Sequence, residues 1–126
     1  MSFTTVNCEG FCSDNVKQGD PVSVVFDEVS GCTKVVPYNG EFAGVALYNI
    51  VNIDLTKEYV SGWNLPMHSK FPIAISGYEI LLPLHGKVGQ FIRPRKDGSW
   101  KVGCKRKSAV GVFVRREDNG SIIRLL

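Results

Sequence analysis

The chain has 126 residues, a length that suits one globular domain able to bury a core without disulfide or metal support. Apolar residues make up 44% of it and charged residues 21%, which excludes a disordered chain, and no apolar run is long enough to span a membrane. The net charge of +3 conceals an asymmetry, because residues 1–63 carry a net charge of −5 and residues 64–126 a net charge of +8. This split indicates either an oriented contact with a charged partner or two solvated faces of opposite sign.

The first half of the chain predicts short strands separated by glycine-containing turns. The predicted strands are residues 1–11, 22–26, 32–36, 42–47 and 50–53. Residues 1–11 fit a free arm equally well. Asp54 is placed to cap a single helical turn over residues 55–60, and the prolines that flank residues 64–72 predict a connecting loop there.

The second half repeats this pattern of strands and turns. The predicted strands are residues 73–84 with a bend at Gly77, 88–93, 99–104, 109–116 and 121–126. Asp97-Gly98 and Asn119-Gly120 are typical hairpin turns. No segment shows sustained helical periodicity. The predicted fold is therefore all-β, a small barrel or sandwich built from two related antiparallel β units with little helix.

A shift of the chain by 67 positions brings the two halves into partial register. Within residues 19–47 six identical residues then coincide: Gly19 with Gly86, Gly31 with Gly98, Lys34 with Lys101, Val35 with Val102, Gly44 with Gly111 and Val45 with Val112. Outside this stretch Gly10 coincides with Gly77 and Asn52 with Asn119. Glycines recur where turns or close backbone approach require them. We interpret residues 1–126 as a single β domain with candidate internal repeats at 3–59 and 70–126.

The cysteines and histidines give little sign of a metal or redox site. Cys8 and Cys12 could bind zinc together with His68 or His85, but the spacing is irregular and no second close pair follows. The first residues lack the basic and apolar segments of a secretory signal. We therefore expect a protein that is not exported, with reduced, structural cysteines.

The sequence offers no arrangement of groups that predicts catalysis. Neither His68 nor His85 stands beside a nucleophile-elbow motif, and the glycines separate strands, whereas a phosphate-binding loop needs them ahead of a helix. Adjacent carboxylates such as those of Glu117 and Asp118 point to opposite faces of an extended chain. We expect no enzymatic activity, no catalytic residues and no cofactor.

The strongest local feature is a basic cluster on either side of the predicted turn at Asp97-Gly98. Its members are Arg93, Arg95, Lys96, Lys105, Arg106 and Lys107. With Trp100 exposed between them, these residues could bind single-stranded nucleic acid by phosphate contact and base stacking. Trp100 fits a core position as well, and the acidic first half would repel a phosphate backbone. The cluster therefore favours contact with a protein surface, with nucleic acid as the alternative and a plain solvated edge as the third interpretation.

A short pattern within residues 19–47 resembles the capsid decoration, or cement, proteins and head-fibre base domains of tailed bacteriophages. A Gly-Asp-x-Val strand is followed there by a Gly-Val-Ala strand, and the residues that carry the pattern are Gly19, Asp20, Val22, Gly44, Val45 and Ala46. In the second half only Gly86, Gly111 and Val112 remain. The resemblance covers about a quarter of the chain.

The resemblance implies a non-enzymatic virion structural protein that binds the outside of a phage capsid and stabilises contacts between major capsid subunits. It further implies a homo-oligomer, with a trimer favoured, that is assembled in the host cytoplasm, and no membrane contact. Two alternatives stay open: a nucleic-acid-binding β-barrel that uses residues 93–107, and a tail or fibre adaptor domain.

Overall fold

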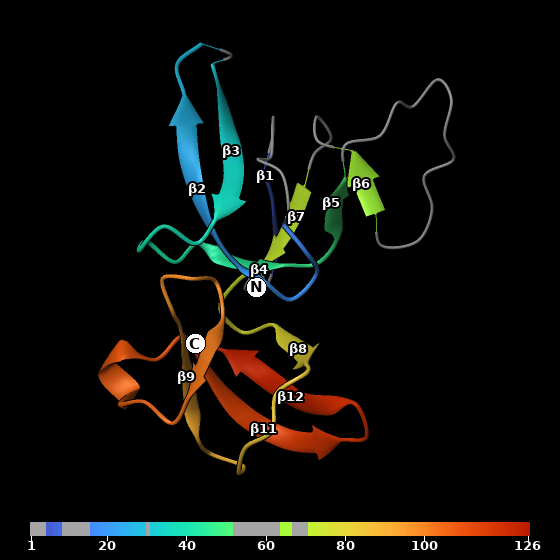
Figure 1. Cartoon of the computed structure of the whole chain (residues 1–126), viewed down its shortest axis with the longest axis vertical. Coiled ribbons are helices and arrows are strands. Elements are labelled where there is room, and N and C mark those ends of the chain that lie inside the picture. Colours follow the sequence, from blue (N-terminus) through green and yellow to red (C-terminus); the bar gives the residue numbers. More distant parts are fainter. Residues whose placement is uncertain (1–4, 9–15, 30, 52–63, 67–70) are drawn as a thin grey trace.

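The computed structural model of the chain describes residues 5–8, 16–29, 31–51, 64–66 and 71–126, which are almost entirely β-structure (Figure 1). The strands that precede residue 75 are β1 (Thr5–Cys8), β2 (Pro21–Asp27), β3 (Cys32–Pro37), β4 (Gly44–Ala46), β5 (Asn49–Val51), β6 (Asn64–Pro66) and β7 (Phe71–Ala74). The later elements are β8 (Glu79–Leu82), β9 (Phe91–Pro94), β10 (Trp100–Val102), the 3-10 helix η1 (Arg106–Ser108), β11 (Gly111–Glu117) and β12 (Gly120–Leu125).

Most of these strands form two five-stranded antiparallel sheets, one in the upper and one in the lower half of Figure 1. Sheet 1 has the order β1-β7-β4-β2-β3 and sheet 2 the order β10-β9-β11-β12-β8, while β5 and β6 form a separate parallel pair. The predicted all-β fold of two antiparallel units with little helix is confirmed. The form is sandwich-like, with two separate sheets. Neither sheet closes into a barrel within the described ranges.

The two sheets connect their strands in the same way. When the strands of each sheet are numbered in chain order, both sheets read 1-5-4-2-3 from edge to edge. The corresponding pairs are β1 with β8, β2 with β9, β3 with β10, β4 with β11 and β7 with β12. Sheet 1 differs in one respect, since β5 and β6 lie between its fourth and fifth strands along the chain.

A turn of the same construction precedes β2 and β9. In the first turn, residues 17–20, the Lys17 N–H donates to the Asp20 carboxylate at 3.0 Å. In the second turn, residues 87–90, the Lys87 N–H donates to the side-chain oxygen of Gln90 at 2.8 Å. The third residue of each turn is a glycine with positive φ, 91° at Gly19 and 90° at Gly89. The two turns are thus related by a shift of 70, and Gly19 corresponds to Gly89. The ungapped shift of 67 predicted Gly86 instead, and that prediction is wrong.

The glycines that begin β4 and β11 keep the predicted shift of 67. A Cβ atom added at Gly44 would meet the carbonyl oxygen of Ala74 and, at 3.2 Å, the side chain of Ile73. One added at Gly111 would meet Ile123 Cγ2 at 2.7 Å. Both glycines therefore let the fourth strand lie close to the fifth, where any side chain would force the strands apart.

Three other predictions fare differently. Residues 64–66, predicted as loop, form β6 because they pair with β5. The strand β7 belongs to sheet 1 through its pairing with β1 and β4, although the predicted repeat 70–126 would place it in the second unit. The helical turn predicted over residues 55–60, with its cap Asp54, lies outside the described residues. The rest of the domain and repeat assignment stays a prediction.

Each half of the molecule has its own cluster of buried side chains. The first consists of Val16, Val22, Val35, Ala46 and Ile73. The second consists of Val45, Ala74, Ile80, Leu82, Ile92, Phe113, Ile123 and Leu125. Because Val45 and Ala74 come from sheet 1 but pack in the second cluster, they join the two halves.

The two clusters differ in side-chain size at two equivalent positions, one in the fourth strand of each sheet and one just before each turn. Ala46 of β4 and Phe113 of β11 stand at the same point of the ladder, opposite the fifth strand. Val16 precedes the first turn and lies in the cluster with Ala46, whereas Gly86 precedes the second turn, where an added Cβ would lie 2.7 Å from the Phe113 ring. In the first half the larger residue, Val16, precedes the turn, and in the second half the larger residue, Phe113, lies in the fourth strand. Each arrangement is compatible with close packing of its core.

Candidate partner-binding surface

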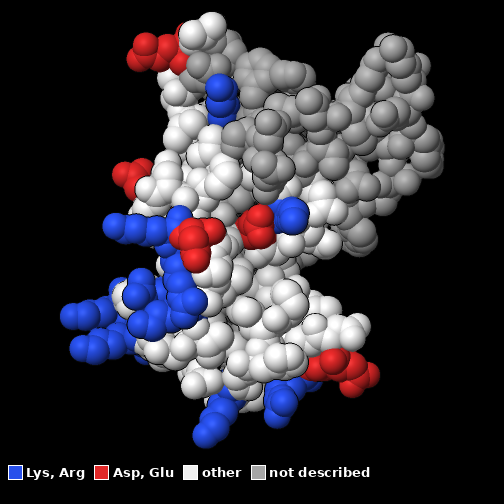
Figure 2. Space-filling model, in the orientation of Figure 1, with Lys and Arg blue, Asp and Glu red and all other residues white. Residues whose placement is uncertain are grey.

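The predicted basic cluster lies on the β9–β10 hairpin and on η1. Arg93 is half-buried in β9, whereas Arg95 and Lys96 are exposed in the turn that follows. The other three predicted residues are exposed at or beside η1, and they are Lys105, Arg106 and Lys107. Figure 2 shows the Lys and Arg side chains gathered on this side of sheet 2.

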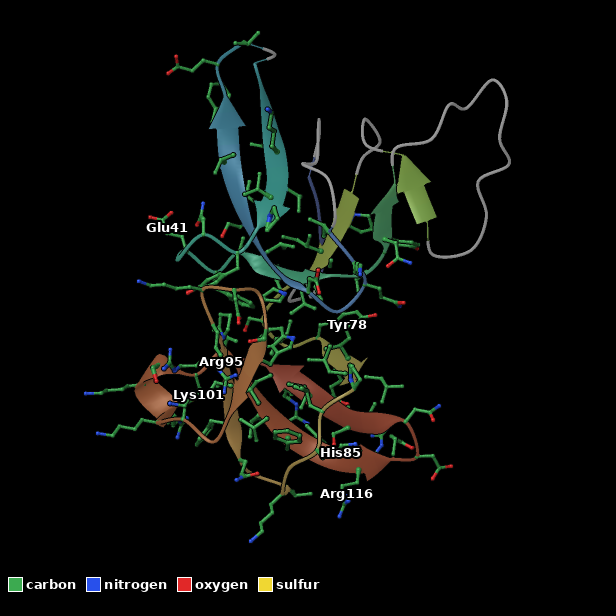
Figure 3. All side chains as sticks on the ribbon, viewed as in Figure 1. Glu41, Tyr78, His85, Arg95, Lys101 and Arg116 are labelled. Atoms are coloured by element: carbon green, nitrogen blue, oxygen red, sulfur yellow. The ribbon has the colours of Figure 1, made fainter. Side chains whose placement is uncertain are left out.

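Lys101 belongs to the same surface, although it was not among the predicted residues. It lies in β10 directly opposite Arg93 in the antiparallel ladder, so the two side chains share one face of the hairpin. In the view of Figure 3, Lys101 and Arg95 are labelled on the same side of sheet 2, and Arg116 and His85 are labelled at its lower end. We name the seven residues the basic surface, and they are Arg93, Arg95, Lys96, Lys101, Lys105, Arg106 and Lys107.

Backbone hydrogen bonds hold the two parts of the basic surface together. After β10 the chain returns beside β9, where the N–H groups of Gly103 and Cys104 donate to the Phe91 carbonyl at 2.8 and 3.3 Å. The N–H of Val110 then donates to the Ile92 carbonyl at 2.8 Å. These bonds fix the segment that contains η1 against the start of β9.

No carboxylate of the described residues forms a salt bridge with the basic surface. The ion pairs among the described residues lie outside the basic surface: Arg115–Glu117 at 2.8 Å on β11, and Arg124–Glu79 at 2.7 Å between β12 and β8. Like charges directly opposite on two strands destabilise a sheet, so the pair Arg93 and Lys101 carries a cost that no salt bridge among the described residues relieves. Seven cations that form no salt bridge within the described part of the chain give this side of the molecule a positive potential.

Asp97, the acidic residue of the β9–β10 turn, is engaged within the turn. Its Oδ1 accepts hydrogen bonds from the Ser99 N–H at 2.9 Å and the Ser99 hydroxyl at 2.6 Å. These bonds, the hydroxyl first, lower the pKa of Asp97, with the charge of Arg95 contributing in the same direction. Asp97 therefore shapes the turn that presents Arg95 and Lys96.

Trp100 lies at the junction of the two halves and contacts residues of the first half. Its indole N–H donates to the Gly19 carbonyl at 3.0 Å. Its ring lies edge-on to Phe42, with 6.4 Å between the ring centroids and 69° between the planes. Because both contacts hold this half-buried indole at the junction, it is less available to stack on a base, which weakens the stacking hypothesis for this residue.

The described residues bring together no cluster of side chains suited to metal binding. His85 is exposed and forms no recorded contact, and no group of three or more His, Cys, Asp or Glu side chains converges among them. Cys104 is a free, half-buried thiol. His68 and Cys12 lie outside the described residues, as does the side chain of Cys8, so the zinc hypothesis stays untested.

Two clefts lie where the halves meet. One of about 450 Å³ is lined by Lys17, Asp20, Pro21, Pro37, Asp97, Gly98 and Ser99. The other, of about 410 Å³, is lined by Gln18, Gly19, Leu47, Tyr48, Tyr78, Glu79, Ile80, Leu81 and Pro83. Sequence reasoning missed both, because their walls come from segments far apart in the chain.

Burial raises the pKa of Asp20, one of the two aspartates that line the first of these clefts. This effect exceeds the opposing hydrogen bond from the Lys17 N–H and the attraction of the Lys17 charge. A raised pKa can mark a functional carboxylate. Here the carboxylate serves as the acceptor of a turn, and Gln90 holds the equivalent position in the second half.

In comparisons with protein-family models, curated proteins and solved structures, no significant match to the chain was found. Among the described residues, no helix has the length and apolar character needed to cross a membrane.

Proposed function

We propose that the protein is a non-enzymatic virion structural protein that binds the outside of a phage capsid and stabilises contacts between major capsid subunits. The observation that carries the proposal is the basic surface, with seven cations fixed on a hairpin and a 3-10 turn and no salt-bridge partner within the described part of the chain. Cations that form no salt bridge within the described residues are available to bind an anionic partner, and this supports the proposal.

The partner that we propose is an acidic surface of the major capsid protein. Each contact would involve exposed lysine and arginine side chains, which individually contribute little free energy. A shell presents many copies of the same acidic surface, and an oligomer of this protein, with a trimer favoured, would engage several at once. Linked weak contacts then give strong overall attachment by avidity. The resemblance of residues 19–47 to capsid decoration proteins supports this choice of partner.

Nucleic acid is the alternative anionic partner for the same surface. The engagement of Trp100 with Gly19 and Phe42 makes it the weaker hypothesis, because a sequence-tolerant single-strand site combines cations with stacking aromatics. A tail or fibre adaptor remains a further alternative within the same class of virion proteins.

Co-sedimentation with capsids assembled from the major capsid protein of the same genome tests the proposal. The double variant R95E/K96E should lose at least about tenfold in affinity, because charge reversal at the tip of the basic surface turns attraction into repulsion. The matched control K87E/R116E makes the same change in net charge at exposed positions outside the basic surface. It should bind within about threefold of the wild type.

Three outcomes would contradict the proposal. The wild type could fail to sediment with capsids, the two double variants could lose affinity equally, or the wild type could bind a single-stranded oligonucleotide more tightly than capsids. Light scattering on the free protein adds the oligomeric state, with a trimer expected.

A further inference from the structure

The strand β8 ends sheet 2, and within the described part of the chain its outer edge pairs with no other strand, so we call it the free edge. Its recorded pairing is with β12 alone, in the register Leu82 opposite Ser121 and Glu79 opposite Arg124. On its other side, no hydrogen bond to the β8 backbone is recorded among the described residues. A free edge is a template for another strand unless charge, proline or a covering segment blocks it.

The phase of the ladder shows which backbone groups face this free edge. The N–H of Leu125 donates to the Tyr78 carbonyl at 2.9 Å, so this pair is a hydrogen-bonded one. Bonded and non-bonded pairs alternate along an antiparallel ladder, and Glu79 and Leu81 therefore belong to the non-bonded pairs. The N–H and C=O groups of both residues point away from β12.

The cleft of about 410 Å³ lies along this edge. On its β8 side it is lined by residues 79–81 and Pro83, and on the other side by residues 18–19, 47–48 and Tyr78. Tyr78 lies at the junction of the two halves in Figure 3. Backbone groups of β8 thus face a partly enclosed space whose walls combine polar groups with the apolar side chains of Leu47 and Ile80.

The side chains of β8 do not protect its edge as those of the opposite edge strand do. The edge strand β10 carries Lys101, and the other cations of the basic surface surround it, which discourages strand addition there. On β8, Leu81 is 47% exposed, and the charge of Glu79 is taken up by Arg124. Pro83 follows the strand and limits the available edge to Glu79 and Leu81.

We propose that the free edge of β8 binds an extended peptide segment of a partner protein by strand addition. The peptide forms backbone hydrogen bonds with Glu79 and Leu81, which supply two donors and two acceptors. Its alternate side chains point into the cleft beside Leu47 and Tyr78, and this favours apolar residues at every second position. The site is separate from the basic surface and does not depend on the partner proposed for that surface.

The walls of the cleft decide between a peptide and a second copy of this chain. Pairing of two β8 edges would bring a folded sheet against the wall formed by residues 18–19 and 47–48. A single extended strand needs only the width of one chain, since neighbouring strands lie about 4.8 Å apart. The occupant that fits is therefore a peptide segment.

Selection from a displayed library of random ten-residue peptides tests the inference, with wild-type protein as the target and L81P as the counter-target. Leu81→Pro removes a donor that faces the cleft and leaves the ladder bonds to β12 in place, because Leu81 belongs to a non-bonded pair. The control Leu81→Ala keeps this donor and removes only the side chain. Selected peptides should bind L81P about tenfold more weakly than the wild type and L81A within about threefold.

Amide shifts of the wild type on addition of a selected peptide provide a second measurement that does not require L81P to fold. The largest shifts should fall on the amides of Glu79 and Leu81. The inference is overturned if no selected peptide distinguishes wild type from L81P, if L81A and L81P lose affinity equally, or if the shifts lie elsewhere.

Discussion

The hairpins β2–β3 and β9–β10 occupy the same place in their sheets, yet they differ in length and surface. The first has six paired positions and carries Phe26, which is 64% exposed, towards its tip. The second has three paired positions and carries the basic surface. The framework of strands is therefore shared between the halves, while the side chains offered to a partner are not.

One ladder position makes the difference concrete. Val22 of β2 and Ile92 of β9 pair with Gly44 and Gly111, so the residues that follow them, Ser23 and Arg93, are equivalent. Ser23 is fully buried, and its hydroxyl accepts a hydrogen bond from the Asn39 N–H at 2.9 Å. Arg93 instead reaches the surface opposite Lys101. The same backbone position is structural in one half and available for binding in the other.

The largest expected effect concerns the exchanged core residues. Phe113→Ala should lower the free energy of unfolding by about 3–5 kcal/mol, because it leaves a cavity in the second core. Gly86→Val alone should also destabilise, because its Cβ meets the Phe113 ring. The double variant copies Val16 and Ala46 of the first half, so it should be less destabilised than the sum of the single variants.

Urea denaturation of the four proteins in this double-mutant cycle measures the coupling. A strictly additive result would show that the two positions do not share a space, and the proposed equivalence of the two cores would be wrong at this point.

The next effect compares the glycines that begin β4 and β11. Gly44→Ala and Gly111→Ala should each cost about 1–3 kcal/mol, because the added methyl group overpacks the contact between the fourth and fifth strands. Gly44→Ala should cost more, since it meets the backbone oxygen of Ala74, whereas Gly111→Ala meets the side chain of Ile123. Thermal unfolding that ranks the two variants in the opposite order would contradict this explanation.

Removal of the hydrogen bond between the halves should have a smaller effect. Trp100→Phe keeps an aromatic ring against Phe42 but leaves the Gly19 carbonyl without its donor, so the free energy of unfolding should fall by about 0.5–1.5 kcal/mol. Chemical denaturation measures the change. If W100F were as stable as the wild type, the contact between Trp100 and Gly19 would contribute nothing to joining the halves.

A charge change at Lys101 should separate stability from binding. Lys101→Glu replaces a like-charge pair with an opposite-charge pair across from Arg93, and should raise the free energy of unfolding by about 0.2–1 kcal/mol. The same change should weaken capsid binding, because it removes a cation from the basic surface. Lys101→Gln should lie between the wild type and K101E in both the free energy of unfolding and the affinity for capsids. A loss of stability in K101E would count against the pairing of Lys101 with Arg93.

The smallest effect concerns the two turns and depends on pH. A carboxyl group whose pKa is raised on folding stabilises the fold below its unfolded pKa, ordinarily 3.8, and this contribution is lost as the pH rises through the folded pKa. Asp20→Asn, which imitates Gln90, should therefore gain stability relative to the wild type between about pH 3 and about pH 7. Melting curves at both values check the sign, and a relative loss over this interval would contradict the burial of Asp20 as the dominant cause.

Much of the fold could be predicted from local signals. Alternation of apolar and polar residues predicted most strands, and Gly31 and Gly98 lie in hairpin turns, where their positive φ values favour glycine. The shift of 67 related Gly44 to Gly111 but misplaced the turns that precede β2 and β9, because an ungapped shift cannot absorb the three-residue difference there. The pairing of residues 64–66 with β5 was missed because parallel pairing over a long connection leaves no local pattern.

The basic surface could be predicted only in part. Six of its residues lie in two short runs, 93–96 and 105–107, that flank the predicted turn. Lys101 lies between these runs, but its place on the same face as Arg93 follows from the register of β9 and β10, which a sequence does not state. The engagement of Trp100 depends on Gly19, 81 residues earlier in the chain. The free edge of β8 follows from the strand order, which is a property of the whole sheet.

Hydrogen–deuterium exchange on the capsid-bound protein tests most directly the claim that the second half carries the docking surface. The account predicts slower exchange on binding across residues 93–107, with little change in β2 and β3. Slower exchange confined to the β2–β3 hairpin, or an unchanged pattern over residues 93–107 on bound protein, would contradict it.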